Sequence, residues 1–296
     1  MNHYGLFIKL MDRQIPVQLL QLLEVWFRSG LTCVRWGDCF SSFYSQTCGI
    51  RQGGVLSPYL FALYIDGVIE KVRRSRVGCE IKLESIGIIV YADDILLVAP
   101  TVTALQLLLS MCEHELNWLA MSINASKAAC LRIGKDYKTV PVCIRTVDGR
   151  EIPWQTTLRY LGMHLVANNV FTCSFDEAKK SYYRAFNAIY SKIGGIASEE
   201  VTLEMLKFKC LPVLLYGTAV CPVNKKQFKS LEYVLTSSLM KVFCTKSKDV
   251  VDDCMKFFGL SSIENIVLRR KNNFEHKYKD VCRYNVVCYA VHSICL

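Results

Sequence analysis

Two adjacent carboxylates, Asp93 and Asp94, lie between two apolar segments, Ile86–Val90 and Ile95–Val98. Apolar, β-rich runs joined by a short polar turn predict a β-hairpin with Tyr91–Asp94 at its tip. We expect the strands to be largely buried, where unpaired negative charge is costly. A divalent cation such as Mg²⁺ would relieve the repulsion between the two acids, because carboxylate oxygens suit it. The alternative is a solvated turn, since Asp is common in turns.

A glycine-rich loop at residues 49–58, upstream of this hairpin, favours ligand binding. It contains a cation, an amide and a glycine pair: Arg51, Gln52, Gly53 and Gly54. Glycine lets the backbone approach a ligand closely, and Arg51 can contact phosphate or stack on a base. Ser57 and Pro58 predict a helix start, with Ser57 capping free N–H groups. A Gly-Gly pair alone indicates only flexibility, so the loop gains its meaning from the acidic hairpin.

Together these segments resemble the reverse transcriptases, most closely those of non-LTR (LINE-type) retrotransposons. The hairpin resembles the catalytic hairpin of the polymerase palm, and the loop resembles its template and nucleotide loop. Further segments resemble, in order, the end of the palm, the primer grip and the thumb region: Ile123–Lys127, Leu158–Gly162 and Leu211–Gly217. The resemblance covers roughly residues 1 to 245.

The resemblance implies template-directed nucleotidyl transfer from dNTPs onto a DNA primer along an RNA template. Two Mg²⁺ ions, with Mn²⁺ as an alternative, would bind at Asp93 and Asp94. Lys127 would neutralise or protonate the leaving pyrophosphate, although an exposed surface amine is an equally good interpretation. The remaining implied contacts are Arg51, Gln52, Gly53 and Gly54 for nucleotide and template, Tyr91 near the primer end, and Tyr160, Leu161 and Gly162 for the primer grip.

One expected component is missing from the sequence. The family's palm has a further metal-binding aspartate on a strand that would precede Asn2–Phe7, and neither Asp12 nor Asp38 is a convincing substitute. We therefore expect a chain truncated at the N-terminus that polymerises poorly or not at all alone. The alternatives are a non-catalytic nucleic-acid-binding remnant and a piece of a larger polymerase that begins upstream of Met1. An intron maturase or a viral RNA polymerase fits less well.

The expected fold class is α+β. We predict a partial palm at residues 1–168, an antiparallel sheet with helices on one face, followed by an all-α thumb-like bundle at 169–246. Residues 247–296 form an extension of unknown role. Local signals include a helix from Pro16 to Gly30, a capping box formed by Ser174 and Glu177, and an interruption of a helix at Pro212.

Charge and composition agree with a nucleic-acid partner. Lys and Arg number 36 against 26 acids, a net charge of +10, which favours polyanions. No apolar run reaches the roughly 18 residues of a membrane span, and no signal peptide is evident. We expect an intracellular protein of the cytoplasm or nucleus, with its 15 cysteines reduced. Cys282, Cys288, His292 and Cys295 suggest zinc, but their spacing does not fit the usual close ligand pairs.

Overall fold

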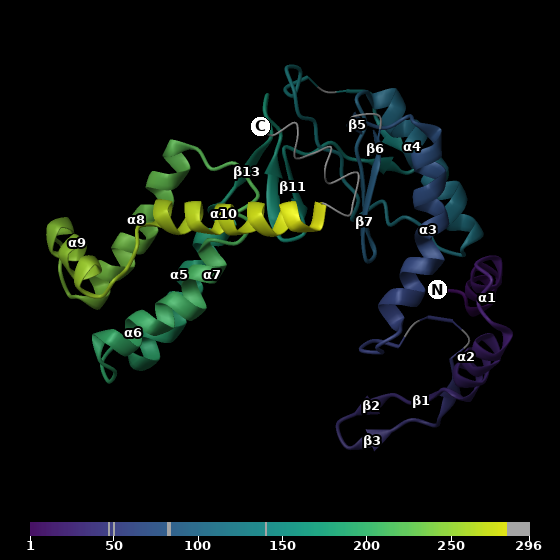
Figure 1. Cartoon of the computed structure of the whole chain (residues 1–296), viewed down its shortest axis with the longest axis horizontal. Coiled ribbons are helices and arrows are strands. Elements are labelled where there is room, and N and C mark those ends of the chain that lie inside the picture. Colours follow the sequence, from purple (N-terminus) through teal and green to yellow (C-terminus); the bar gives the residue numbers. More distant parts are fainter. Residues whose placement is uncertain (47, 50, 82–83, 140, 283–296) are drawn as a thin grey trace. The chain divides into compact units, whose positions relative to one another are not determined.

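The computed structural model describes residues 1–46, 48–49, 51–81, 84–139 and 141–282. The chain forms two compact units, each with its own core, whose elements are labelled in Figure 1. Unit 1 consists of Met1–Ala128 and Pro141–Pro153. Unit 2 consists of Ala129–Val140 and the chain from Trp154 onwards. The predicted functional division at residues 168 and 246 is not tested by these units and stays a prediction.

Helices supply most of the core of unit 1. They are α1 (His3–Asp12), α2 (Val17–Ser29), α3 (Ser57–Ser75) and α4 (Val102–Trp118). Helix α3 runs beside α4 (Figure 1). The ring of Tyr64 from α3 is fully buried in the core that these helices share with α1. The Tyr64 hydroxyl donates to the Leu119 carbonyl and accepts from the Asn2 N–H at 3.2 Å. The Tyr64 side chain therefore links the start of α1 and the end of α4 to α3.

The strands of unit 1 pair in antiparallel fashion, as predicted, but they form separate small sheets. The pairs are β1 (Leu31–Thr32) with β4 (Tyr44–Ser45), β2 (Arg35–Trp36) with β3 (Cys39–Phe40), β5 (Glu80–Ile81) with β6 (Glu84–Ser85), β7 (Ile88–Tyr91) with β8 (Asp94–Leu97), and β9 (Ile144–Arg145) with β10 (Glu151–Ile152). Helices cover the β7–β8 pair, since α3 packs on β7 and α4 on β8. Among the described residues, one continuous palm-sized sheet is not formed.

The β9–β10 hairpin returns to unit 1 and docks on α4. The side-chain amide of Gln106 donates to the Arg145 carbonyl at 2.8 Å and accepts from the Arg145 N–H at 2.9 Å. Glu113, which is buried, accepts from the Val147 N–H at 2.9 Å. These bonds satisfy backbone groups that a two-stranded ribbon leaves open at its edge.

Unit 2 begins with a three-stranded antiparallel sheet and continues as helices. The strands are β11 (Thr157–Tyr160), β12 (Met163–Val166) and β13 (Thr172–Ser174). The helices are α5 (Asp176–Ile193), α6 (Glu199–Met205), the π-helix η1 (Leu206–Cys210), α7 (Leu211–Leu214), α8 (Lys225–Val242), α9 (Lys248–Phe257) and α10 (Ile263–Cys282). Val251, Ile263 and Val267 share one core with Leu231 and Leu239, so the C-terminal helices pack on the same bundle.

One local prediction is confirmed and two are wrong in detail. Helix α2 lies between Pro16 and Gly30 as predicted, and its apolar side chains Leu22 and Trp26 are exposed. Ser174 and Glu177 form no capping box, because α5 begins at Asp176 and Ser174 instead accepts from the Asp176 N–H. Pro212 lies in the first turn of α7, and the predicted interruption is the π-helix before it, where the missing N–H and the proline ring disturb the preceding turn.

Two further expectations concern membrane spans and zinc ligands. No helix among the described residues combines the length and the apolar character that crossing a membrane requires. Of the suggested zinc ligands, Cys282 ends α10, and its side chain and the other three residues lie outside the described part of the chain.

Candidate active site

The predicted acidic hairpin is present, but its tip is more open than expected. Tyr91 pairs with Asp94, which leaves Ala92 and Asp93 as the turn. Ala92 has a φ of 51°, in the left-handed region that non-glycine residues rarely occupy. Ile88 is buried at the base of the hairpin, whereas the tip is exposed, and the side chain of Tyr91 is 64% exposed. The expectation of largely buried strands is therefore wrong at the tip, where residues 91–94 are all exposed.

Because the hairpin tip is exposed, burial gives no reason for a cation at the two acids. Carboxylates in contact with water need no cation to offset burial, so desolvation does not itself demand a metal at Asp93 and Asp94. The two side chains still supply the oxygen ligands that Mg²⁺ prefers. Among the described residues, however, no three side chains of Asp, Glu, His or Cys gather into a group that could hold a metal. The acids therefore fit part of a metal site.

The glycine-rich loop is a compact turn tied to the start of α3. The Ser57 hydroxyl donates to the Arg51 carbonyl at 2.8 Å, and the Gly54 N–H donates to the same oxygen at 3.2 Å. Gly53 has a φ of 78°, and a Cβ on Gly54 would lie 2.6 Å from the Ser57 hydroxyl oxygen. The backbone of Gly53 thus favours glycine, and a Cβ on Gly54 would displace the Ser57 hydroxyl from its bond to Arg51. The side chains of Arg51 and Gln52 are exposed.

Ser57 does not cap α3 as predicted. The residue before the helix is Leu56, whose side chain makes no capping bond, and Ser57 is already helical. Its hydroxyl closes the loop instead of the helix end. Pro58 does lie in the first turn of α3, as the sequence predicted.

The loop is also fixed to the beginning of the chain. The Gly49 N–H donates to the Met1 carbonyl at 2.7 Å, and Cys48 forms an antiparallel bridge with Asn2. A ring nitrogen of His3 lies 3.0 Å from the Gly49 carbonyl oxygen. Ile50 lies outside the described residues, so the loop is defined on either side of it.

Lys127 occupies a tight turn after α4. Asn124 accepts from both the N–H and the hydroxyl of Ser126, and the Lys127 N–H donates to the Asn124 carbonyl at 3.1 Å. The Lys127 side chain is exposed. This geometry agrees equally with a pyrophosphate contact and with a plain surface amine, so the predicted role stays a prediction.

In unit 2, the predicted primer-grip segment is a β-hairpin. Tyr160 pairs with Met163, and both turn residues, Leu161 and Gly162, have positive φ angles of 46° and 80°. Such turns match the twist of the strands they join. The Tyr216 hydroxyl donates to the Leu161 carbonyl at 2.9 Å. The sequence places Leu161 in the primer-grip segment and Tyr216 in the thumb segment, and no local signal indicates that these two segments are in contact.

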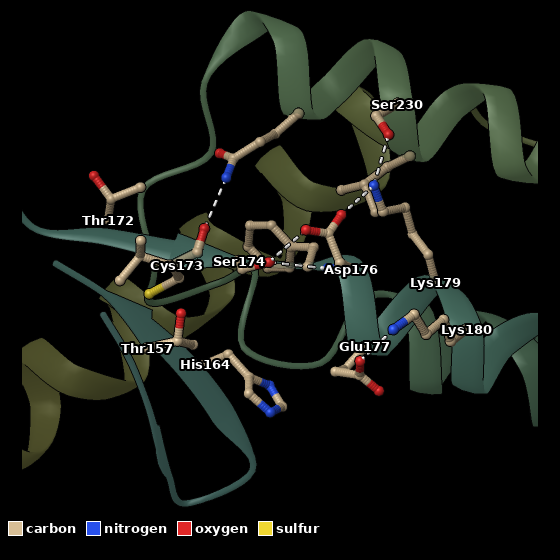
Figure 2. Close-up of a pocket in the computed structure, with 14 residues that line it drawn as sticks. Thr157, His164, Thr172, Cys173, Ser174, Asp176, Glu177, Lys179, Lys180 and Ser230 are labelled. Atoms are coloured by element: carbon tan, nitrogen blue, oxygen red, sulfur yellow. Dashed lines mark hydrogen bonds and ion pairs between the residues drawn. The ribbon is translucent and has the colours of Figure 1, made fainter. Parts of the chain in front are cut away.

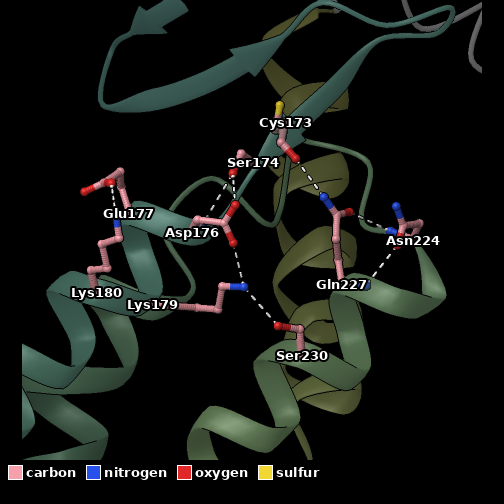
Figure 3. A network of polar contacts seen from close by, with 9 residues as sticks. All are labelled: Cys173, Ser174, Asp176, Glu177, Lys179, Lys180, Asn224, Gln227 and Ser230. Carbon is pink, nitrogen blue, oxygen red and sulfur yellow. Dashed lines mark hydrogen bonds and ion pairs between the residues drawn. The ribbon is translucent and has the colours of Figure 1, made fainter. Parts of the chain in front are cut away.

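The polar face of the same sheet lines a pocket of about 650 Å³, drawn in Figure 2. Thr157, His164 and Ser174 line its sheet side, and the first turns of α5 and α8 complete it. Lys179 lies 2.7 Å from an Asp176 carboxylate oxygen and donates to the Ser230 hydroxyl at 2.9 Å. This network joins α5 to α8 (Figure 3).

The charges in this network are mutually stabilised. The Lys179 ammonium, followed by the Ser174 hydroxyl, holds the pKa of the Asp176 carboxyl below its usual value. The Lys180 ammonium likewise lowers the pKa of Glu177, from which it lies 2.7 Å. Gln227 links the network to the sheet by donating to the Cys173 carbonyl at 2.7 Å.

Comparison with known proteins identifies the class. Residues 1–165 match the family described as reverse transcriptase (RNA-dependent DNA polymerase). Because this match spans more than half of the chain, the chain belongs to the reverse transcriptase family. The match contains the loop at 51–54, the acidic hairpin, Lys127 and the turn at 160–162.

The relatives narrow the class to LINE-type enzymes, as predicted. The chain is 27% identical over 140 residues to a Pol polyprotein from a type-1 retrotransposable element R2 of Nasonia vitripennis, covering 46% of this chain and 14% of that protein. It is 24% identical over 187 residues to that of the type-2 element R2DM of Drosophila melanogaster, covering 59% and 17%. It is also 24% identical over 203 residues to an R2 Pol polyprotein of Popillia japonica, covering 65% of this chain and 27% of that protein. The chain thus spans between 14% and 27% of the length of these relatives.

Proposed function

We propose that this chain supplies the catalytic hairpin, the nucleotide loop and the primer-binding elements of an RNA-directed DNA polymerase. Residues 1–168 would act as part of the palm and residues 169–246 as the thumb, with an RNA template, a DNA primer and dNTPs as substrates. Exposure of the hairpin tip and of Arg51 and Gln52 supports this proposal, because these groups are free to contact a ligand. Arg51 and Gln52 would contact the incoming nucleotide and the template, and Tyr91 would lie near the primer end.

Asp93 and Asp94 are the residues that would hold Mg²⁺, or Mn²⁺ in its place. Metal bound there would supply the Lewis acidity that two-metal nucleotidyl transfer uses. The chain's own residues would bind and orient the substrates: Gly53 and Gly54 keep the loop close to the new base pair, and Lys127 offers a positive charge to the pyrophosphate. The strained turn at Ala92 would fix the direction of the two acids.

We further propose that the 296-residue chain alone polymerises poorly or not at all. The observation that carries this proposal is the lack, among the described residues, of a third metal-binding side chain beside Asp93 and Asp94. Asp12 ends α1, and Asp38 is in the β2–β3 turn, paired with Arg35 at 3.8 Å. Loss of one source of pre-organised charge commonly costs roughly 10²–10³ in rate.

Primer extension tests both proposals. Purified chain, RNA template and labelled DNA primer are incubated with dNTPs and either Mg²⁺ or Mn²⁺, and Asp93→Asn is the matched control. We expect no extension above the level of that control. Extension by the parent chain that Asp93→Asn abolishes would disprove the proposed inactivity and support the catalytic assignment at the same time.

The alternative function is nucleic-acid binding without catalysis. It is favoured by exposed basic residues in the first turns of α8, at Lys225, Lys226 and Lys229. Fluorescence anisotropy with an RNA–DNA duplex, with and without dNTP, separates the two functions. A catalytic domain should bind the matching dNTP in a Mg²⁺-dependent manner that Asp93→Asn weakens. A binding remnant should bind duplex equally well in both variants and show no such dNTP effect.

A further inference from the structure

We propose that Tyr216 is a positioning residue for the β11–β12 turn, and that helix α10 controls the same turn through Arg270. This inference rests on the proposed function, in which that turn holds the primer end. It also gives a role to the C-terminal extension, for which the sequence suggested none.

The first step is the contact between Tyr216 and the turn. The Tyr216 hydroxyl donates to the Leu161 carbonyl at 2.9 Å, and a Cβ on Gly162 would lie 3.2 Å from a ring carbon of Tyr216. Leu161 has a φ of 46°, which is unfavourable for a leucine. A residue held in such a conformation needs support from its surroundings, and the Tyr216 hydroxyl and ring provide it.

The second step is the backbone next to Tyr216. Gly217 has a φ of 74°, which favours glycine, and a Cβ there would lie 2.2 Å from the Met163 sulfur, so a larger residue would displace the Met163 side chain. Met163 is the first residue of β12 and packs against the core of unit 2. The pair Tyr216-Gly217 therefore contacts the turn and the strand that leaves it.

The third step leads to α10. An Arg270 guanidinium nitrogen, Nη1, donates to the Leu215 carbonyl at 3.2 Å, and the buried Thr218 hydroxyl donates to the same oxygen at 2.8 Å. Burial, followed by the charge of Arg269, lowers the pKa of Arg270, but an arginine remains charged at neutral pH. A charged donor strengthens a hydrogen bond to a backbone carbonyl, and this bond links α10 to the residue directly before Tyr216.

If Tyr216 served only to pack the core of unit 2, its side chain would be buried. Its side chain is 54% exposed, so the hydroxyl adds little to the core of unit 2. The matched control is Tyr190, whose hydroxyl also donates to a backbone carbonyl, that of Lys241, at 3.0 Å. Tyr190→Phe removes a bond of the same kind away from the turn.

Hydrogen exchange of the full chain tests the coupling itself. We expect Tyr216→Phe to speed exchange at residues 157–166 by roughly fivefold, the effect of losing one hydrogen bond, with little change in melting temperature. Tyr190→Phe should leave this segment unchanged. Equal exchange at 157–166 in the parent chain and Tyr216→Phe would overturn the proposal for Tyr216.

Arg270→Met tests the link to α10, with Arg269→Met, an exposed neighbour, as its control. We expect faster exchange in Arg270→Met both at 211–220 and at 157–166. Faster exchange at 211–220 alone would show that α10 stabilises α7 but has no effect on the β11–β12 turn. That outcome would overturn the second half of the proposal.

A primer-end probe connects the turn to function. An RNA–DNA duplex carries 2-aminopurine at the primer 3′ end, and its fluorescence is measured with each variant. Tyr216→Phe should alter this fluorescence while the duplex Kd stays close to that of the parent chain and of Tyr190→Phe. If Tyr216→Phe loosens the turn yet leaves the fluorescence unchanged, Tyr216 does not position the primer. If the parent chain fails to bind the duplex, the proposed function fails, and exchange alone decides the coupling.

Discussion

Ala92 combines two properties that rarely occur together, a methyl side chain and a φ of 51°. The left-handed conformation costs an L-residue about 1–2 kcal/mol, and glycine avoids this cost. Glycine also gives the unfolded chain more conformational entropy, which lowers stability by about 0.4–1 kcal/mol. Ala92→Gly should therefore raise the free energy of unfolding by up to about 1 kcal/mol. Ala62→Gly, at an exposed position inside helix α3, is the control and should lower it by about 0.5–1 kcal/mol. Urea unfolding measures both, and a loss in both variants would show that the hairpin tip is unstrained.

Tyr64 carries a different kind of constraint, because its hydroxyl is fully buried. Tyr64→Phe removes the donor to the Leu119 carbonyl and leaves the Asn2 N–H without its acceptor. Asn2 is exposed, so water can replace its acceptor, whereas the Leu119 carbonyl loses a buried bond. One buried group left unpaired costs about 1–3 kcal/mol, and we expect unit 1 to lose stability in that range. Tyr59→Phe, exposed on the same helix, should change little. Thermal unfolding of the two variants gives the comparison, and equal melting temperatures would contradict the assigned role.

At the level of elements, Glu232 of α8 joins the start of α10 to the bundle. Its carboxylate accepts from the Ile263 N–H at 2.8 Å, while burial raises its pKa above the usual value. An acid whose pKa is raised in the folded state binds its proton more tightly there. Its stabilising contribution is full below the unfolded pKa, about 4.3, and is lost as pH rises through the folded value.

Glu232→Gln should therefore make the protein more stable at neutral pH, since the amide oxygen keeps the bond to Ile263 without a buried charge. The expected gain in melting temperature is at most about 2–4 °C, and it should disappear near pH 4. Glu200→Gln, exposed on α6, is the control and should show no such pH dependence. A gain that grows on acidification would have the wrong sign for this mechanism.

Elements with strong local signals could be predicted from the sequence, and their surroundings could not. The acid hairpin and the first-turn position of Pro58 in α3 follow from turn and helix-start chemistry, which acts between neighbours. The Ser174–Glu177 capping box failed because Ser174 is the last residue of β13, and pairing with β12 fixes its backbone. Bonds such as Gln106 to Arg145 and Tyr216 to Leu161 join residues 39 and 55 positions apart, for which a single sequence carries no signal.

Across the whole molecule, the net charge is +10, but not every lysine is equally available to bind an anion. Lys180, Lys207 and Lys256 form ion pairs with the acids three residues before them, at 2.7, 2.7 and 3.1 Å. By contrast, Lys225, Lys226 and Lys229 are exposed, and none forms an ion pair with a described residue. They occupy the first turns of α8, where the helix already carries positive partial charge. Cations are unfavourable at that end, so this cluster weakens the helix and strengthens the local attraction for anions.

Replacing all three lysines by glutamine should lower duplex affinity and its salt dependence together. Each phosphate neutralised contributes about 0.9 to the slope of log K against log salt, so the slope should fall by roughly 2–3. The matched control replaces Lys180, Lys207 and Lys256, whose own acids already neutralise them, and should alter the slope much less. Anisotropy titrations across a series of salt concentrations measure both slopes. Equal losses in the two triple variants would mean that duplex binding depends on total charge, and a specific thumb-like surface at α8 would then be excluded.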